Sequence, residues 1–238
     1  SRPSRDTIHG DDAVKPCVSV VIPIHNTGRL LEACLASVMA QTLRDIEIIC
    51  VDDASTDDSP AILAALARRD ARIRVLTHDA NQGIGPTRNT GVRAARADYI
   101  AAVDSDDTID PEMLATLHAA AIEGDFDVVC CGARVVDEAG QVLETWVRPD
   151  ATVIITQRHR DLFDLVDPMA WNKLWRRSIF TDHDIWFPAG TRHEDLGWTY
   201  RALMQARRIR ILDRPFYNYL LRMESVSHAF DTAHLVDH

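Results

Sequence analysis

The first half of the chain alternates short apolar runs with longer segments whose apolar residues recur at helical spacing, and no other feature constrains the fold as strongly. The apolar runs, each about the length of one strand, are 17–24, 46–51, 73–76, 99–103 and 126–131. Helices are expected between them, at 29–40, 59–69, 85–96 and 111–121. Strands that alternate with helices predict an α/β fold with a mainly parallel central sheet. Because the runs are apolar throughout, helices should cover both faces of that sheet.

The pattern changes after residue 133. A hairpin is expected around 138–140, a short helix at 158–166, a helix at 194–206 and a strand at 209–212. All five tryptophans lie in this second half, and no linker separates it from the first. We therefore expect a flexible leader at 1–16, a single domain over 17–228 with halves 17–133 and 134–228, and a tail at 229–238 that is open to continuation in a longer protein.

The charge of the chain excludes one class of partner. The formal net charge is −10 at pH 7, whereas nucleic acid recruits clustered Lys and Arg, so no nucleic-acid partner is expected. An acidic protein can still bind an anionic nucleotide through a divalent cation. No apolar run is long enough to span a membrane, and the five cysteines, an odd number, sit mostly in strand-like runs. We interpret them as buried thiols of a reducing compartment and expect a cytoplasmic protein.

The strongest local signal is the acidic run Asp104-Ser105-Asp106-Asp107, directly after an apolar strand. Carboxylates this close repel one another unless a cation lies between them. Oxygen ligands suit Mg²⁺ or Mn²⁺, and Mg²⁺ is commonly held by one or two carboxylates together with substrate phosphates. The alternative is a helix start, where Asp is favoured, but the segment 110–112 already supplies one. The run therefore predicts a divalent-cation site.

Two weaker motifs follow other strands. In V-D-D-A-S-T-D (51–57), Asp53 at the strand end can accept a hydrogen bond from a nucleobase, but an Asx turn with a helix cap explains the same residues. In N-Q-G-I-G-P-T-R-N (81–89), the glycines allow a tight turn into a helix whose N-terminus favours anions, with Arg88 in its first turns. An ordinary Gly-rich turn explains this segment too. Neither a Walker loop nor a dinucleotide fingerprint is present.

Together these motifs resemble glycosyltransferase family 2, a large family with the GT-A fold. The matching segments are V-S-V-V-I-P-I-H-N (18–26), V-D-D-A-S-T-D (51–57), N-Q-G-I-G-P-T-R-N (81–89), D-S-D-D (104–107), W-N-K-L-W-R-R (171–177), H-E-D (193–195) and Y-N-Y-L-L-R-M-E-S-V-S (217–227). The last three resemble bacterial members that build capsule, O-antigen or other surface polysaccharides. The resemblance covers about residues 17–228, and it implies a nucleotide-sugar-binding half followed by an acceptor half that carries the catalytic base.

The resemblance also implies roles for residues at the strand ends. Pro23, His25 and Asn26 match the loop that packs on the nucleotide base, although the family often has Tyr at the position of His25. Asp53 matches the carboxylate that accepts from the uracil N–H. Arg88 matches the basic residue near the donor sugar and phosphate.

The acidic run and the later motifs complete the expected site. Asp104, with Ser105 beside it, matches the first carboxylate of the DxD motif, near ribose and sugar. Asp106 matches the ligand of a divalent cation, Mn²⁺ or Mg²⁺, with Asp107 in support. Asp195 matches the general base, although charge at a helix N-terminus explains an acidic pair there without catalysis. Arg222 and Ser225 match a loop that can close over the diphosphate, and further supporting residues are His193, Glu194, Ser227 and His228.

The expected function is metal-dependent, inverting transfer of a sugar from a nucleotide sugar, with UDP favoured, to a glycan or lipid-linked acceptor. Such an acceptor would bring a cytoplasmic enzyme into peripheral contact with the inner membrane face. Three alternatives stay open: an inactive sugar-nucleotide-binding module, a nucleotidyltransferase, and a nicotinamide-dependent dehydrogenase, which the missing fingerprint disfavours. Release of nucleoside diphosphate instead of pyrophosphate separates the transferase from the nucleotidyltransferase.

Overall fold

The computed structural model describes residues 15–155, 162–190 and 194–222. The first half contains four parallel strands in the order β3-β2-β1-β4. Their bounds are Val18–Ile24 (β1), Ile46–Asp52 (β2), Ile73–Thr77 (β3) and Tyr99–Ala102 (β4). These are the strands that the apolar runs predict, and β1 and β2 are buried along their whole length. Strands covered on both faces need apolar side chains on both, which is why the runs do not alternate in polarity.

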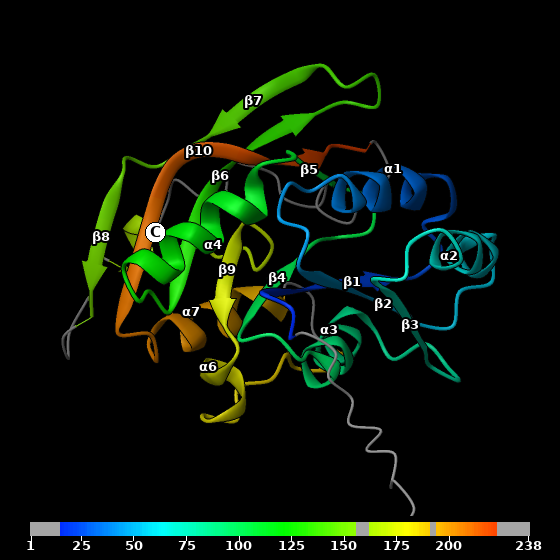
Figure 1. Ribbon diagram of the computed structural model, residues 1–238, viewed down its shortest axis with the longest axis horizontal. Helices are drawn as coiled ribbons and strands as arrows, with labels where there is room; N and C mark the ends of the chain where they lie inside the picture. The colour runs from blue at the N-terminus through cyan, green and yellow to red at the C-terminus, as the bar shows by residue number, and fades with distance from the viewer. Residues whose placement is uncertain (1–14, 156–161, 191–193, 223–238) are drawn as a thin grey trace, which may run out of the picture.

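Helices cover both faces of this sheet, as predicted (Figure 1). Helices α1 (Gly28–Met39), α2 (Ser59–Ala67) and α4 (Met113–Glu123) share an apolar core with one face. Helix α3 (Ile84–Ala94) packs on the other face. A Cβ at Gly91 would lie 2.3 Å from Cγ1 of Val21, so the missing side chain lets α3 approach β1 closely.

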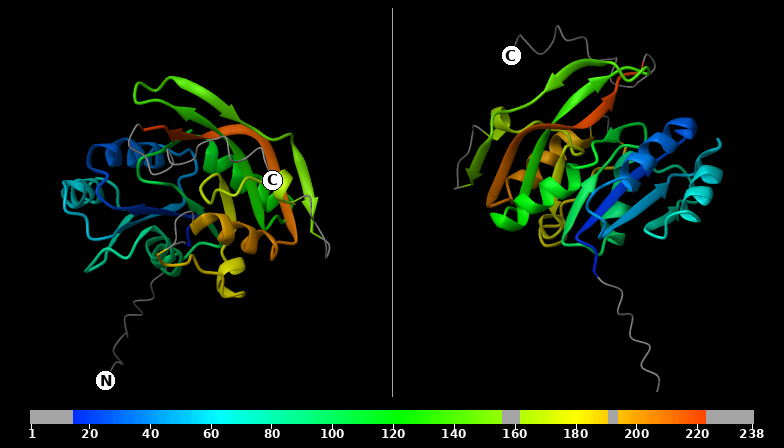
Figure 2. Two further views of the ribbon diagram at one scale, coloured as in Figure 1. Left: turned by 180° about the vertical axis from the view of Figure 1, so that it is seen from behind. Right: turned by 45° about the horizontal axis from the view of Figure 1, so that its top comes forward.

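The second half extends the same sheet beyond β4. Its strands are β5 (Thr108–Ile109), β6 (Val128–Val136), β7 (Val142–Trp146), β8 (Ala151–Ile154), β9 (Lys173–Arg176) and β10 (Arg208–Leu220). The order continues as β9-β6-β10-β5, with β7 paired to β6 and β8 paired to β10. The hairpin expected around 138–140 is confirmed as the β6–β7 turn. In the views of Figures 1 and 2, β10 is strongly bent and β7 lies at the rim of the sheet.

The α/β architecture is confirmed, but the sheet is mixed where the sequence predicts it to be mainly parallel. Strand β9 runs antiparallel to both β4 and β6 and so joins the two halves of the sheet. The sequence pattern does not predict β9, because its four residues lie inside a Trp-rich segment without turn signals on either side. Strand β10 is much longer than the predicted 209–212, because it continues through register shifts around Pro215.

The remaining helices are α5 (Leu162–Leu165), α6 (Ser178–Thr181) and α7 (Glu194–Leu203). The predicted helix at 158–166 falls partly outside the described residues, and α5 lies within its described part. Trp198 of α7 stacks on Phe187 and Phe180, with ring centroids 3.8 and 4.8 Å apart. This aromatic cluster holds α7 against the same face of the sheet as α3.

All five cysteines are free thiols, and all except the half-buried Cys17 are buried. Burial raises the pKa of Cys50 to about 12, which keeps it an inert thiol. Within the part of the chain that the structure describes, no helix has the length and apolar character that crossing a bilayer requires.

Candidate active site

The carboxyl ends of β1, β2 and β4 lie side by side, because these strands are adjacent and parallel. His25 and Asn26 follow β1, Asp53 follows β2, and Asp104 lies just beyond β4. Ligands of open α/β sheets bind at this edge. The structure therefore brings together the strand-end residues that the sequence singles out.

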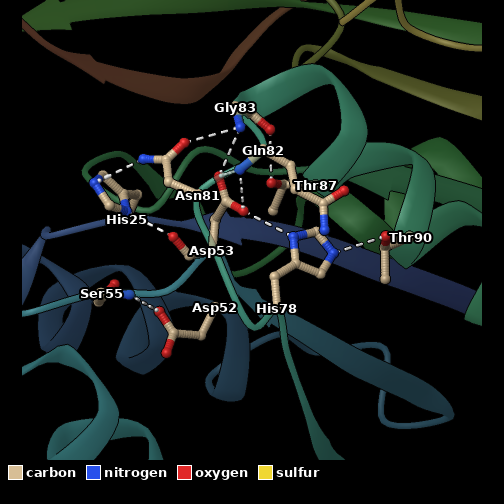
Figure 3. Close-up of polar contacts among 10 residues, drawn as sticks. All are labelled: His25, Asp52, Asp53, Ser55, His78, Asn81, Gln82, Gly83, Thr87 and Thr90. Atoms are coloured by element: carbon tan, nitrogen blue, oxygen red, sulfur yellow. Dashed lines mark hydrogen bonds and ion pairs between the residues drawn. The ribbon is translucent and has the colours of Figure 1, made fainter.

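Asp53 is only 2% exposed, and protein groups hold its carboxylate (Figure 3). Oδ1 accepts from the Gln82 N–H at 2.9 Å and lies 2.7 Å from Nδ1 of His78, while Oδ2 accepts from the Gly83 N–H at 2.8 Å. Burial alone would raise the pKa of Asp53, but the bonds from Gln82, His78 and Gly83 outweigh it and lower the pKa. Asp53 is therefore an anion that fastens the loop before α3 to the end of β2.

His25 joins the same loop from the end of β1. Its Nδ1 lies 2.8 Å from the carbonyl oxygen of Asp53, so Nδ1 carries the proton and donates it. Nε2 is then free to accept from Nδ2 of Asn81 at 3.0 Å. These bonds fix the exposed imidazole next to the equally exposed Asn26, whereas Pro23 is buried within β1. In the loop that the resemblance assigns to the nucleotide base, the exposed ring is therefore the imidazole of His25.

Arg88 and Asp104 form a partly buried ion pair between α3 and the turn after β4. Nη2 of Arg88 donates to Oδ1 of Asp104 at 2.7 Å, and the Arg88 side chain is 3% exposed. The guanidinium also lies over the ring of Phe187, 5.3 Å from its centroid. Two motifs that are separate in the sequence are therefore one electrostatic unit in the fold.

Asp106 pairs with Arg222, at the end of β10. Nη2 of Arg222 lies 2.6 Å from Oδ2 of Asp106. Burial and the nearby charge of Asp104 raise the pKa of Asp106, and Arg222 opposes that rise. Ser105, which lies between Asp104 and Asp106 in the sequence, is buried. A cavity of about 380 Å³ adjoins this pair, and its lining residues are Asn26, Thr27, Gly28, Arg29, Leu30, Asp57, Glu138 and Arg222.

Asp107 bonds to two residues of β10 and holds that strand in place. Its Oδ1 accepts from the Leu220 N–H at 2.7 Å, and its Oδ2 accepts from the Tyr217 hydroxyl at 2.8 Å. That hydroxyl in turn accepts from the Asp104 N–H at 3.1 Å. Burial, with the charges of Asp106 and Asp104, raises the pKa of Asp107 well above its usual value. Tyr217, stacked on Trp171 at 4.2 Å, is a site residue that the sequence reasoning missed.

Asp195, in the first turn of α7, lies close to the Arg88–Asp104 pair. Burial raises its pKa, the charge of Asp104 adds to the rise, and Arg88 and Lys173 oppose it. Lys173 is itself fully buried on β9, and its Nζ donates to the carbonyl of Met169 at 2.6 Å. The charges of Arg88, Asp104 and Lys173 therefore all act on the predicted base at the start of α7.

The placement of Asp195 depends on contacts between α3 and the segment before α7. Nδ2 of Asn89 donates to the Phe187 carbonyl at 2.9 Å, and the Phe187 N–H donates back to Oδ1 of Asn89 at 2.9 Å. Phe187 stacks on Trp198, which lies about one turn after Asp195 on α7. Rigid packing therefore links the helix that carries Arg88 to the helix that carries Asp195.

The protein side chains that could bind a cation suit one that is held partly by substrate oxygens. Among the described residues, no three His, Cys, Asp or Glu side chains converge on one point. Asp106 has a raised pKa and pairs with the partly exposed side chain of Arg222, whereas Asp107 is committed to backbone and hydroxyl donors. One carboxylate plus phosphate oxygens is an ordinary Mg²⁺ environment, so the residues present fit a metal that arrives with a nucleotide.

Some predicted residues lie outside the described part of the chain. These are His193, Ser225, Ser227 and His228. The backbone of Glu194 begins α7, but its side chain is also outside the description. The competition between Glu194 and Asp195 for the role of base therefore stays a prediction.

Comparison with known proteins gives one consistent result. The family model described as Glycosyl transferase family 2 matches residues 19–231. EpsJ of Bacillus subtilis, named an uncharacterized glycosyltransferase, is 36% identical over 216 residues, which cover 86% of this chain and 61% of EpsJ. The poly(ribitol-phosphate) beta-glucosyltransferase of Bacillus spizizenii is 31% identical over 213 residues, covering 87% of this chain and 32% of that protein.

The structural comparison agrees. Residues 1–349 of S. aureus TarS, solved in complex with UDP-GlcNAc, match with a TM-score of 0.78 and 26% identity, over 90% of this chain and 61% of that chain. This match confirms the GT-A fold. The chain spans about three fifths of the length of three curated relatives that it matches, at 61% to 63%.

Proposed function

The chain belongs to glycosyl transferase family 2, and on that basis we propose that it transfers a sugar from a UDP-sugar to a hydroxyl group of a glycan or lipid-linked acceptor. Relatives named as glycosyltransferases of bacteria support a role in surface polysaccharide synthesis. The bound UDP-GlcNAc of the similar TarS structure supports a UDP-linked donor. With a lipid-linked acceptor and the cytoplasmic location that is part of this proposal, the enzyme would work against the inner membrane face.

The observation that carries the proposal is the convergence of Asp195 with the Arg88–Asp104 pair at the carboxyl edge of the sheet. In the proposed reaction Asp195 takes the proton from the acceptor hydroxyl as its oxygen attacks the anomeric carbon. A carboxylate whose pKa burial has raised is a stronger base than an exposed one. Attack on the face opposite the leaving diphosphate inverts the anomeric configuration.

The other end of the reaction needs positive charge at the leaving diphosphate. We assign the divalent cation, Mn²⁺ or Mg²⁺, to Asp106, and when bound it would neutralise charge on the leaving group. We assign Arg88, which donates to Asp104, to the donor sugar and phosphate, and Arg222, which lines the adjoining cavity, to the diphosphate. A guanidinium suits phosphate because its fork donates two hydrogen bonds.

The proposal is tested with a panel of UDP- and GDP-sugars, Mn²⁺ or Mg²⁺, and simple glycan acceptors. The expected result is release of UDP, dependent on the cation and on acceptor, with a product of inverted anomeric configuration by proton NMR. Given UTP and a sugar 1-phosphate instead of these substrates, a nucleotidyltransferase would form the UDP-sugar and release pyrophosphate, and that result would reassign the protein. Tight UDP binding without any transfer across the panel would favour an inactive binding module.

A further inference from the structure

A largely buried histidine lies next to the base end of the proposed nucleotide site (Figure 3). His78 directly follows β3, and its side chain is 9% exposed. Nδ1 lies 2.7 Å from Oδ1 of Asp53, and Nε2 lies 2.9 Å from Oγ1 of Thr90 on α3. Figure 3 shows His25 and His78 on opposite sides of Asp53, so the exposed imidazole and the largely buried one both bond to Asp53. None of the sequence motifs assigns His78 a role.

The direction of each hydrogen bond follows from the acceptor. Asp53 is an anion with a lowered pKa and can only accept, so Nδ1 of His78 carries the proton. In the neutral imidazole Nε2 is then an acceptor, and it takes the hydroxyl proton of Thr90. Helix α3 is itself fixed by its close approach to β1 at Gly91. A rigid helix therefore orients His78, and His78 orients Asp53.

The carboxylate of Asp53 has little capacity left for a ligand. A carboxylate offers about four acceptor directions. The Gln82 N–H reaches both oxygens, at 2.9 and 3.1 Å, and the Gly83 N–H and His78 take one oxygen each. Gly83 has φ +91°, a conformation that L side chains rarely adopt, so the loop depends on these bonds for its shape. Asn81 of the same loop donates to His25, the residue at the base-packing position.

We propose that His78 is a positioning residue for the nucleobase, acting through Asp53 on the loop 81–83 without touching the nucleotide. The inference rests on the proposed function, because it concerns the site where that function places a uridine nucleotide. Asp53 then contributes to base binding mainly by shaping the loop and by orienting His25 through its carbonyl oxygen. The phosphate end of the site is built on Arg88 and Arg222, and the bonds of His78 go to Asp53 and Thr90 instead.

Two substitutions distinguish the contribution of Nδ1 of His78 from that of Nε2. The side-chain amide nitrogen of Asn in His78→Asn can occupy the place of Nδ1 and keep donating to Asp53. Gln in His78→Gln reaches toward Thr90 instead and loses the donor to Asp53. His78→Gln should weaken UDP binding about tenfold or more, because a hydrogen bond to a charged group is lost. Affinity for inorganic pyrophosphate with Mn²⁺ should change less than about twofold, and His78→Asn should recover most of the UDP affinity.

The experiment combines calorimetric titration of UDP and pyrophosphate with amide hydrogen exchange of the free protein. Faster exchange at Gln82 and Gly83 in His78→Gln, with the UDP-selective loss and recovery in His78→Asn, supports the inference. Equal losses for UDP and pyrophosphate together with a lower Tm would overturn it, since that pattern is a general structural role. Unchanged UDP affinity and unchanged exchange would overturn it as well. If the wild type binds neither UDP nor GDP, the proposed function itself fails, a result distinct from a normal wild type with an unaffected variant.

Discussion

Nη2 of Arg222 lies 2.6 Å from Oδ2 of Asp106, so a guanidinium neutralises the carboxylate that we propose for the divalent cation. Both side chains are partly exposed, at 35% and 21%, which lets a cation from solvent compete with Arg222. A nucleotide would offer Arg222 a new partner, because the same residue lines the adjoining cavity. The pair therefore couples binding of the cation at Asp106 to binding of the nucleotide by Arg222.

Arg222→Gln should have opposite effects on two affinities. Mn²⁺ alone should bind more tightly, on the order of tenfold, because its cationic competitor is gone. UDP in the presence of saturating Mn²⁺ should bind more weakly, because the charged hydrogen bonds to the diphosphate are lost. Electron paramagnetic resonance titration of Mn²⁺, with and without UDP, measures both. Arg93→Gln, which removes an exposed guanidinium lying 4.2 Å from the centroid of Trp186, is the matched control. A parallel fall in both affinities would contradict the competition.

Asp106 and Asp107 are neighbours with different expected effects on binding and stability. Asp106→Ala should abolish Mn²⁺-dependent UDP binding and leave the thermal unfolding midpoint nearly unchanged, because its only described partner is a surface-reaching arginine. Asp107→Ala should lower the free energy of unfolding by about 1–3 kcal/mol, because it leaves the Leu220 N–H and the Tyr217 hydroxyl without their acceptor. Calorimetry of UDP with Mn²⁺, and again after removal of the metal with EDTA, tests binding; thermal denaturation tests stability. UDP binding by Asp106→Ala at wild-type strength would remove the metal assignment.

Asp195→Asn should lose turnover while keeping the nucleotide. Removing a general base typically costs about 10²–10⁴ in rate, so kcat should fall by that factor. UDP affinity should stay within about threefold, because the donor contacts assigned to Arg88, Asp104 and Asp106 remain. The matched variant is Glu194→Gln, measured for turnover and UDP binding in the same way. A larger loss of turnover in Glu194→Gln than in Asp195→Asn would show that the other carboxylate of the pair is the base.

Glu47 should make the stability of the fold depend on pH. It is 2% exposed at the start of β2 and accepts from the Ser19 hydroxyl, the Arg96 N–H and the Arg74 guanidinium, each at 2.7 Å. Burial alone would raise its pKa, but these bonds and the Arg96 side chain lower it below the ordinary 4.5. A lowered folded-state pKa adds stability above about pH 4.5, and this contribution is lost as the pH falls through the lower value.

Glu47→Gln should therefore lower the free energy of unfolding by about 1–3 kcal/mol near neutral pH, and the difference from wild type should shrink below about pH 4.5. Urea denaturation across that range measures it. Asp98→Asn is the control, because its ion pair with Lys15 is mostly exposed and such pairs contribute little. A constant difference between Glu47→Gln and wild type at all pH values would show that packing, not charge, is what the substitution removes.

Much of the fold could be predicted because its first half repeats one local rule. Apolar runs of strand length separated by amphipathic segments specify buried parallel strands with helices on both faces, and β1 to β4 and α1 to α4 follow that rule. The second half could not be predicted as well, because its pattern is not local. Strand β9 is held by pairing with β4 and β6 on both sides, and a four-residue strand carries too little periodicity to be recognised alone.

The candidate site divides in the same way. The sequence by itself determined that Asp53 and the acidic run would meet, because parallel strands end at one edge of a sheet. Only the tertiary structure decided which partner each carboxylate has. Asp107 accepts from Tyr217, 110 residues away, and Asp106 pairs with Arg222. Asp53 bonds to His78 and to the loop before α3. The physical reason is that a carboxylate is chemically the same wherever it stands in a sequence. Its burial, its pKa and its freedom to bind a ligand are set by donors that only folding brings within hydrogen-bonding distance.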